Sequence, residues 1–392
     1  MSGSKSSRNF VAPHIAGLPK SGIRDFFNLV AERPDVISLG IGEPDFQTPW
    51  HIRERAIEAI ERGQTRYTAN LGTIALRKAI AGYTRERFGC AYDWQTETLV
   101  TVGVSEGLDT ALRAILSPGD EVLYHEPCFV AYAPIVQMAH AVPVPVATRA
   151  RDGFRPRLED LEAAVTPRTR ALLINFPNNP TGAALTEADT RMIAGFAARH
   201  DLLVISDEVY SELTYDIPRV SIAALPGMKE RTLFLNGFSK AWSMTGFRLG
   251  YACAPAAIID AMMKIHQYTM MCASSISQAA GVEAVKNSLS DIDEMRVSYA
   301  LRRNFITSRF NEIGLDCLLP EGAFYVFPSI QRTGLSSMEF CVKLLEQESI
   351  ACVPGSAFGA CGEGFIRACY ATGMDDVKEA MNRIGAFVKR VT

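Results

Sequence analysis

The sequence lacks long apolar runs, an excess of either charge, and a paired cysteine pattern. Nowhere do 18 apolar residues follow one another, so no membrane-spanning helix is expected. With 40 Lys and Arg against 43 Asp and Glu, the chain has no basic stripe, and nucleic acid is not an expected partner. The nine cysteines are odd in number and show no C-x-x-C spacing. No metal site is predicted, and a reducing, cytoplasmic setting is expected.

The length of 392 residues, with 48% hydrophobic and 21% charged residues, allows one large and one smaller domain. From residue 98, short apolar runs alternate with amphipathic helical stretches. The runs cover residues 99–102, 121–124, 171–174, 202–205 and 233–235. This alternation predicts an α/β fold with a mainly parallel sheet, of the seven-stranded type, covered by helices.

The order of elements changes after about residue 256 and predicts a smaller α+β domain. We predict that residues 1–47 form an N-terminal segment contributing to this small domain. Residues 48–285 are predicted as the large domain and residues 286–392 as the small C-terminal domain. Ser21 is predicted to cap a helix that runs to about Ala31.

In open sheets of this kind, ligands bind beyond the carboxyl ends of the strands. Polar or aromatic residues follow each of the five apolar runs. They include Gly103, Val104, Ser105, Cys128, Phe129, Asn179, Asp207, Tyr210, Ser239 and Lys240. We therefore expect these residues to surround one ligand.

Two nucleotide-binding interpretations fail on missing residues. Gly40-Ile41-Gly42 begins a dinucleotide-binding fingerprint, but Asp45 occupies the position of its last glycine. The run at residues 203–208 looks like a Walker B strand, yet the chain contains no G-x-x-x-x-G-K-[ST] motif to hold the phosphates. Neither class of site is predicted.

An α/β-hydrolase remains an alternative. Residues 103–107 match G-x-S-x-G between a predicted strand and a predicted helix, which makes Ser105 a candidate nucleophile. Asp207 and His266 follow in the required order. However, there is no H-G-G-G-like oxyanion segment, and this interpretation leaves Lys240 without a role.

A pyridoxal phosphate site would give a role to residues at the end of every predicted strand. A buried lysine can have a lowered pKa and attack a carbonyl, which suits Lys240. The amides at Gly103-Val104-Ser105 suit a phosphate, together with Ser239 and Arg248. Asp207 can pair with the protonated ring nitrogen that this cofactor needs as an electron sink.

Three further residues complete this set. Phe129 offers a ring face, and Asn179 and Tyr210 can donate hydrogen bonds to the ring oxygen. Taken singly, Phe129 is more typical of a core residue and Tyr210 of an amphipathic surface residue. Taken with Lys240 and Arg248, the set indicates a cofactor site.

Six motifs carry a resemblance to a known family. They are Leu-Gly-Ile-Gly-Glu-Pro-Asp-Phe at 39–46, Pro-Asn-Asn-Pro-Thr-Gly at 177–182, Ser-Asp-Glu-Val-Tyr at 206–210, the lysine motif at 239–250, Gly-Ala-Phe-Tyr at 322–325 and Gly-Ser-Ala-Phe-Gly at 355–359. The chain resembles the fold type I, class I/II aminotransferases of the aspartate aminotransferase superfamily, close to the aromatic aminotransferase branch.

The resemblance implies a role for each site residue. Lys240 is the lysine that bonds to the cofactor, Asp207 the partner of the ring nitrogen, and Arg367 the clamp for the substrate α-carboxylate. By the resemblance, Asn179 and Tyr210 bind the ring oxygen, and Gly42 and Asn179 also contact the substrate. The phosphate is bound by Ser239, Arg248, Val104 and Ser105. Tyr67 makes a contact across a homodimer interface. Phe129 departs from the family, since many members carry Trp or Tyr there.

The implied activity is ping-pong transfer of an amino group from an aromatic or broad range of L-amino acids to a 2-oxo acid such as 2-oxoglutarate. A β-eliminating lyase on the same scaffold shares every cofactor residue and remains an alternative. The sensor module of a transcription regulator needs a preceding DNA-binding segment, for which residues 1–35 are too short. No residue of the sequence decides between aromatic, acidic and N-acyl diamino acid donors.

Overall fold

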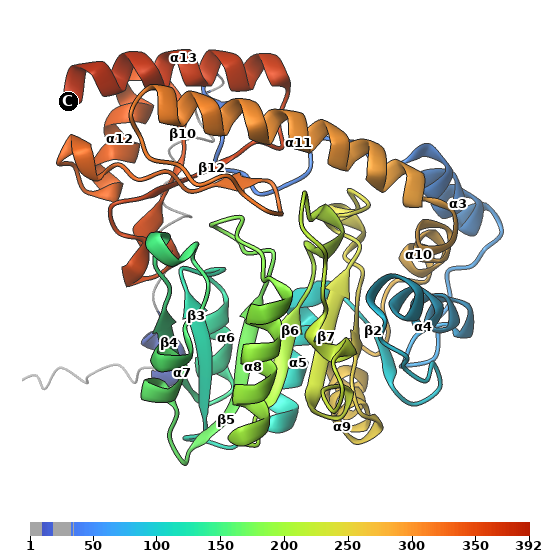
Figure 1. Ribbon diagram of the computed structural model, residues 1–392. Coiled ribbons are helices and arrows are strands. Elements are labelled where there is room, and N and C mark those ends of the chain that lie inside the picture. Colours follow the sequence, from blue (N-terminus) through green and yellow to red (C-terminus); the bar gives the residue numbers. More distant parts are fainter. Residues whose placement is uncertain (1–9, 19–32, 34) are drawn as a thin grey trace, which may run out of the picture.

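The computed structural model describes residues 10–18, 33 and 35–392. Its centre is a seven-stranded sheet with the strand order β2-β8-β7-β6-β5-β3-β4, which Figure 1 shows from β4 on the left to β2 on the right. The strands are β2 (Thr98–Thr101), β3 (Glu121–Glu126), β4 (Val142–Ala147), β5 (Thr169–Asn175), β6 (Leu203–Asp207), β7 (Thr232–Gly237) and β8 (Gly250–Cys253). Only β8 runs antiparallel to its two neighbours, so the predicted mainly parallel sheet is confirmed.

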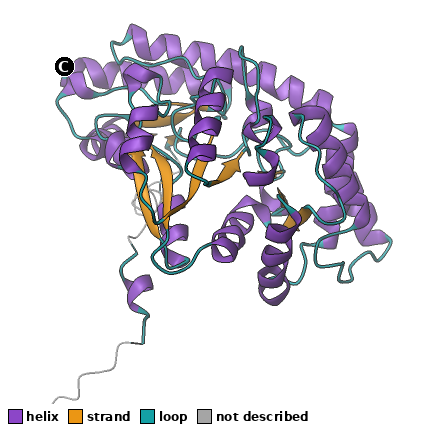
Figure 2. Cartoon of the chain, turned by 60° about the horizontal axis from the view of Figure 1, so that its bottom comes forward, coloured by secondary structure: helices purple, strands orange, loops and turns teal. Residues whose placement is uncertain are grey.

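Helices cover both faces of this sheet, as Figure 2 shows for the purple helices around the orange strands. The helices of this part of the chain are α3 (Trp50–Glu61), α4 (Ile74–Phe88), α5 (Gly103–Ile115), α6 (Tyr132–Met138), α7 (Leu158–Ala164), α8 (Glu187–Arg199), α9 (Ala256–Thr269) and α10 (Ser275–Asn287). Some of them begin at side-chain caps: the Thr73 hydroxyl accepts from the Leu76 amide, and Thr186 forms a capping box with Asp189. The short α1 (Pro13–Ala16) lies against α6.

Two strands of the sheet carry weak sequence signals. The edge strand β4 contains Pro143 and Pro145, and a proline cannot donate a hydrogen bond to a neighbouring strand. An edge position tolerates this because one side of β4 has no partner strand. The other strand, β8, is four residues long and begins at a glycine. Its sequence alone therefore does not distinguish it from the preceding loop.

The last third of the chain forms two smaller sheets and three long helices above the carboxyl edge of the large sheet (Figure 1). The elements are β1 (Ile37–Ser38) paired with β10 (Ile350–Ala351), the sheet β11 (Val353–Pro354), β12 (Ile366–Cys369) and β9 (Tyr325–Val326), and α11 (Leu289–Glu312), α12 (Ser337–Glu348) and α13 (Met374–Val391). Because β1 pairs with β10, an N-terminal strand joins the C-terminal part of the fold.

One hydrophobic core serves this upper part. It includes Leu39 from the N-terminal side and Phe310, Phe340 and Phe387 from the three long helices. The domain boundaries at residues 47 and 285 stay a prediction, and the helix predicted from Ser21 to about Ala31 lies outside the described residues. Within the described residues, no helix combines the length and the apolar character needed to cross a membrane.

Candidate active site

A cavity of about 650 Å³ lies where the loops after β2, β3, β5, β6 and β7 meet the smaller sheets. The structure brings together in its wall, side by side, all the residues predicted to bind the cofactor or substrate, except Tyr67. These are Gly42, Val104, Ser105, Phe129, Asn179, Asp207, Tyr210, Ser239, Lys240, Arg248 and Arg367. Of the other strand-end residues, Gly103 and Cys128 do not line it. Tyr67 lies between α3 and α4 and is 82% exposed, so it does not contribute to the cavity of its own chain.

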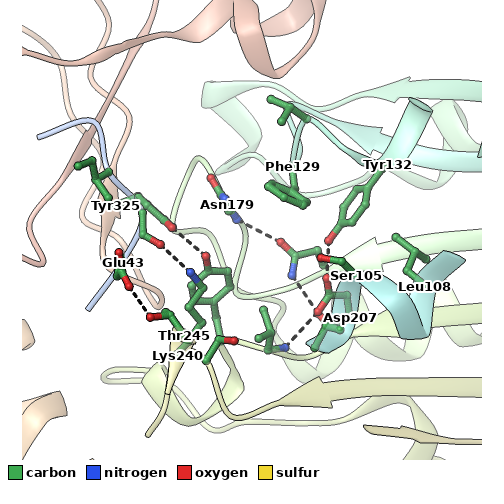
Figure 3. A pocket seen from close by; sticks show the side chains of 18 of the residues that line it. Glu43, Ser105, Leu108, Phe129, Tyr132, Asn179, Asp207, Lys240, Thr245 and Tyr325 are labelled. Atoms are coloured by element: carbon green, nitrogen blue, oxygen red, sulfur yellow. Dashed lines mark hydrogen bonds between the residues drawn. The ribbon is translucent and has the colours of Figure 1, made fainter. Parts of the chain in front are cut away.

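Lys240 follows β7 and points into the cavity (Figure 3). Its Nζ donates a hydrogen bond of 2.6 Å to the Gly42 carbonyl oxygen. Burial lowers the pKa of this amine to about 8, since desolvation disfavours the charged form. A large fraction of Lys240 is therefore uncharged in mildly alkaline solution, which is the form that attacks a carbonyl.

Asp207 ends β6 and is 6% exposed. The Tyr132 hydroxyl donates to its Oδ2 at 2.7 Å, and the Val209 amide donates to its Oδ1 at 3.2 Å. Burial raises the pKa of Asp207 to about 6, although the bond from Tyr132 opposes this shift. No cationic side chain in the described part of the chain forms an ion pair with this carboxylate, so it suits a positively charged ligand atom.

The N-terminus of α5 and Arg248 form an anion site. Val104 and Ser105 line the cavity in the first turn of this 13-residue helix, where unpaired amides and the helix dipole favour an anion. Gly103 has φ +76°, and a Cβ there would lie 2.7 Å from Arg248 Nη2. Among the described residues, the Arg248 guanidinium donates to the Thr245 carbonyl at 3.2 Å. Gly103 thus has a φ that an L side chain rarely adopts, and a Cβ there would crowd the end of the Arg248 side chain.

Arg367 on β12 is a buried arginine without a carboxylate partner among the described residues. It donates to Asn179 Oδ1 at 2.9 Å and to the Gly40 carbonyl at 2.6 Å. Its guanidinium stacks on the rings of Tyr325 and Phe358, 4.6 and 4.8 Å from their centroids. The Nε atom is buried with no hydrogen-bond partner in the structure. Such a guanidinium suits a planar carboxylate.

The hydrolase interpretation is wrong. His266 Nδ1 lies 3.1 Å from a carboxylate oxygen of Glu106, and its Nε2 is buried with no hydrogen-bond partner in the structure. Asp207 binds Tyr132 and the Val209 amide instead of a histidine. Since His266 pairs with Glu106, the Ser105–His266–Asp207 triad that this interpretation requires does not form.

The family model for aminotransferases of class I and II matches residues 34–384. The chain belongs to this aminotransferase family. Among its relatives, YugH of Bacillus subtilis is 50% identical over 384 residues, 98% of this chain and 100% of that protein. The aspartate aminotransferase of Pyrococcus abyssi is 46% identical over 367 residues, 93% of this chain and 94% of that protein.

A solved structure, the aromatic aminotransferase from Pyrococcus horikoshii OT3, superimposes with a TM-score of 0.90 at 46% identity. The match covers 94% of this chain and 99% of that one. The protein is therefore an enzyme of amino-group transfer, and the names of its relatives favour this over β-elimination. Aminotransferases of this family use pyridoxal phosphate.

Five polar side chains of this aminotransferase site were not assigned a role from the sequence: Glu43, Tyr132, Asn175, Thr245 and Tyr325. Asn175 ends β5, where its Oδ1 accepts from the Asn179 amide at 3.2 Å and its Nδ2 donates to the Asp207 carbonyl at 2.9 Å. The position of Asn175 at a strand end was a usable signal. Tyr325 stands in the Gly-Ala-Phe-Tyr motif at 322–325, which gave it no role of its own, and Tyr132 carried no signal. The contacts of both hydroxyls are visible only in the structure.

Proposed function

We propose that the cavity binds pyridoxal phosphate through Lys240 and transfers amino groups from amino acids with aromatic or other apolar side chains to a 2-oxo acid. The observation that carries the proposal is the presence of three separate charge sites in one cavity. They are the amine of Lys240, the unpaired carboxylate of Asp207 and the anion site at Arg248. Their chemistry matches the carbonyl, the ring nitrogen and the phosphate of this cofactor.

The described residues fit the cofactor in shape as well as in charge. The cavity volume of about 650 Å³ lies within the range typical of small-molecule sites. Phe129 supplies an aromatic wall and lies edge-on to Tyr132, with the ring centroids 5.7 Å apart. Asn179 and Tyr210 are buried polar groups that line the same cavity and supply hydrogen bonds for the ring oxygen.

When bound, pyridoxal phosphate supplies an electron-accepting ring that stabilises negative charge on the α-carbon of the substrate. Asp207 holds a proton on the ring nitrogen by pairing with it. Arg367 orients the substrate through its α-carboxylate. The Nζ atom of Lys240 would take the proton from the α-carbon of the substrate as a general base and deliver it, as a general acid, to the former carbonyl carbon of the cofactor.

The charge balance of the cavity supports an apolar donor side chain. The cations that line it are Lys240, Arg248 and Arg367, and the cofactor and the α-carboxylate occupy all three. Among the described residues, no further cation lines the cavity to meet a second carboxylate. The apolar side chains of the wall are Ile41, Leu108, Val130, Ile135 and Val209, and the carboxylate of Glu43, which also lines the cavity, would repel a second carboxylate.

A homodimer is part of the proposal. Tyr67 is 82% exposed, and Tyr268, Met270 and Met271 are also exposed, which leaves large apolar side chains uncovered. We infer that Tyr67 enters the cavity of a second copy, and sedimentation of the purified protein as a monomer would contradict this. A cytoplasmic setting also stays a prediction, supported by nine unpaired cysteines.

The experiment that tests the proposal locates the cofactor bond. The protein is incubated with pyridoxal phosphate, reduced with borohydride and digested, and the modified lysine is found by mass spectrometry. We expect modification at Lys240 and loss of transamination in Lys240→Ala. Lys264→Ala is the control, because Lys264 is a surface lysine paired with Asp260. Modification elsewhere, or an active Lys240→Ala variant, would overturn the proposal.

A panel of donors and acceptors then tests the substrate class. Each amino acid is supplied with 2-oxoglutarate or with a monocarboxylic 2-oxo acid, and the consumption of donor is measured against ammonia release. We expect aromatic donors to exceed aspartate in kcat/KM. Ammonia release without consumption of the acceptor would restore the lyase alternative.

A further inference from the structure

Tyr325 contacts three parts of the cavity wall that come from distant segments of the chain. It lies on β9, and it is 1% exposed. Its hydroxyl oxygen lies 2.8 Å from the hydroxyl oxygen of Tyr210, which follows β6 in the large sheet. Its ring lies against the Arg367 guanidinium. Gly42 leaves room for it, since a Cβ at that position would clash with the Tyr325 hydroxyl.

The two hydroxyls share one hydrogen bond, and its direction matters. Burial raises the pKa of both Tyr210 and Tyr325, so each oxygen keeps its single proton. A phenol donates one hydrogen bond and accepts others. If Tyr210 donates its proton to a ligand in the cavity, its oxygen can only accept from Tyr325. Tyr325 is then the donor of the pair.

We propose that Tyr325 is a positioning residue for transamination: its hydroxyl donates to Tyr210, which strengthens the bond from Tyr210 to the ring oxygen of the cofactor, and its ring holds the Arg367 guanidinium in place. The inference rests on the proposed binding of pyridoxal phosphate. Hydrogen bonds in a chain polarise one another, and each strengthens its neighbour by roughly 10–30%. Tyr325 thus acts on the cofactor through Tyr210.

The sign of the effect follows from charge. A donor to the negatively charged ring oxygen withdraws charge from it. The nitrogen of Lys240, bonded to the cofactor beside that oxygen, then holds its proton less tightly. Removing the Tyr325 hydroxyl leaves more charge on the oxygen. We therefore expect the pH midpoint of the visible absorbance change of the loaded enzyme to rise, by about 0.3 pH unit.

The test is a spectroscopic pH titration of the loaded protein and its Tyr325→Phe variant. The control is Tyr370→Phe, because the Tyr370 hydroxyl donates at 3.1 Å to the Ala323 carbonyl in the same core but does not line the cavity. We expect a raised midpoint in Tyr325→Phe only, with an unchanged KM for the donor because the ring remains. Tyr325→Leu removes the ring as well, and its KM should rise about tenfold.

A double-mutant cycle makes the route through Tyr210 testable. In the Tyr210→Phe background, Tyr325→Phe should leave the midpoint unchanged, since the bond between them is already lost. Equal midpoints in the unaltered protein and Tyr325→Phe would overturn the inference, as would the same shift in Tyr370→Phe or an undiminished shift in the Tyr210→Phe background. If the unaltered protein develops no visible band with pyridoxal phosphate, the proposed function fails first and the inference with it.

Discussion

Replacing Asp207 by Asn should stabilise the cofactor-free protein while it weakens cofactor binding. The carboxyl is buried, and burial raises its pKa from the ordinary 3.8 to about 6. Above pH 6 the group is ionised in both the folded and the unfolded chain, so folding must bury a charge that no cation pairs. An amide at position 207 avoids that cost and keeps a similar shape.

The magnitude follows from proton linkage. A pKa raised from 3.8 to about 6 corresponds to at most about 3 kcal/mol of lost stability at pH 7 and above. Between these two pKa values the folded state binds a proton that the unfolded state does not, so the cost falls as the pH falls. Below about pH 4 the carboxyl is neutral in both states. The advantage of Asp207→Asn should therefore be largest above pH 6 and disappear toward pH 4.

Urea unfolding of the cofactor-free proteins at pH 7.5 and pH 5.0 measures this difference, with the fluorescence of the buried Trp242 as one reporter. Pyridoxal phosphate should then stabilise the unaltered protein far more than Asp207→Asn, because only the carboxylate pairs with the ring nitrogen. Glu208→Gln is the matched control. Glu208 is also buried, but it binds the hydroxyls of Ser211 and Ser221 and does not line the cavity.

Two results would refute this reasoning. One is an Asp207→Asn protein that is less stable than the unaltered protein at pH 7.5. The other is a stability difference that stays the same between pH 7.5 and pH 5.0, since the cost would then not come from ionisation. Glu208→Gln should be stabilised by pyridoxal phosphate as much as the unaltered protein is. If that stabilisation were lost, the effect would not be specific to the carboxylate of Asp207.

Two further substitutions test the anion sites. Gly103→Ala should weaken pyridoxal phosphate binding at least tenfold in an absorbance titration, because a Cβ would crowd Arg248. Gly119→Ala shares the positive φ but meets no atom within 4 Å, and equal affinities of the two variants would contradict the explanation. Arg367→Lys should raise KM for the best amino acid donor by roughly tenfold to a hundredfold, because a lysine cannot bind a carboxylate with two parallel hydrogen bonds. KM for the corresponding amine, which lacks the carboxylate, should not change. An equal rise in KM for both donors would assign Arg367 a different role.

The sequence predicted the central strands of the sheet better than the edge strand β4. The run at β6 is apolar throughout because both its faces are covered, and its core residues Val204 and Ile205 are fully buried. The edge strand β4 alternates Val and Pro, a composition that normally argues against a strand. Its assignment depends on having only β3 as a neighbour, which is a property of the whole sheet and is not visible in the segment itself.

The candidate site divides in the same way. Lys240, Asp207 and Arg248 were predicted because each is a charged residue close to a strand end. A charged side chain in such a place is favourable when a ligand of opposite charge or a reacting group pairs with it. Tyr132 and Tyr325 were not predicted, since their function depends on hydroxyl contacts across 75 and 115 residues of chain. No local pattern encodes a contact of that kind.

The structure also adds how the cations of the cavity are held, which their positions in the sequence do not show. Lys240 and Arg367 donate to the carbonyl oxygens of Gly42 and Gly40, and Arg248 donates to that of Thr245. Neutral carbonyl oxygens fix the direction of these side chains without neutralising them. A phosphate or carboxylate therefore replaces weaker, neutral acceptors by charge-assisted hydrogen bonds, and it does not have to break an ion pair first. The carbonyl oxygens of Gly40 and Gly42 thus hold Arg367 and Lys240 in place and leave both side chains without an ion-pair partner among the described residues.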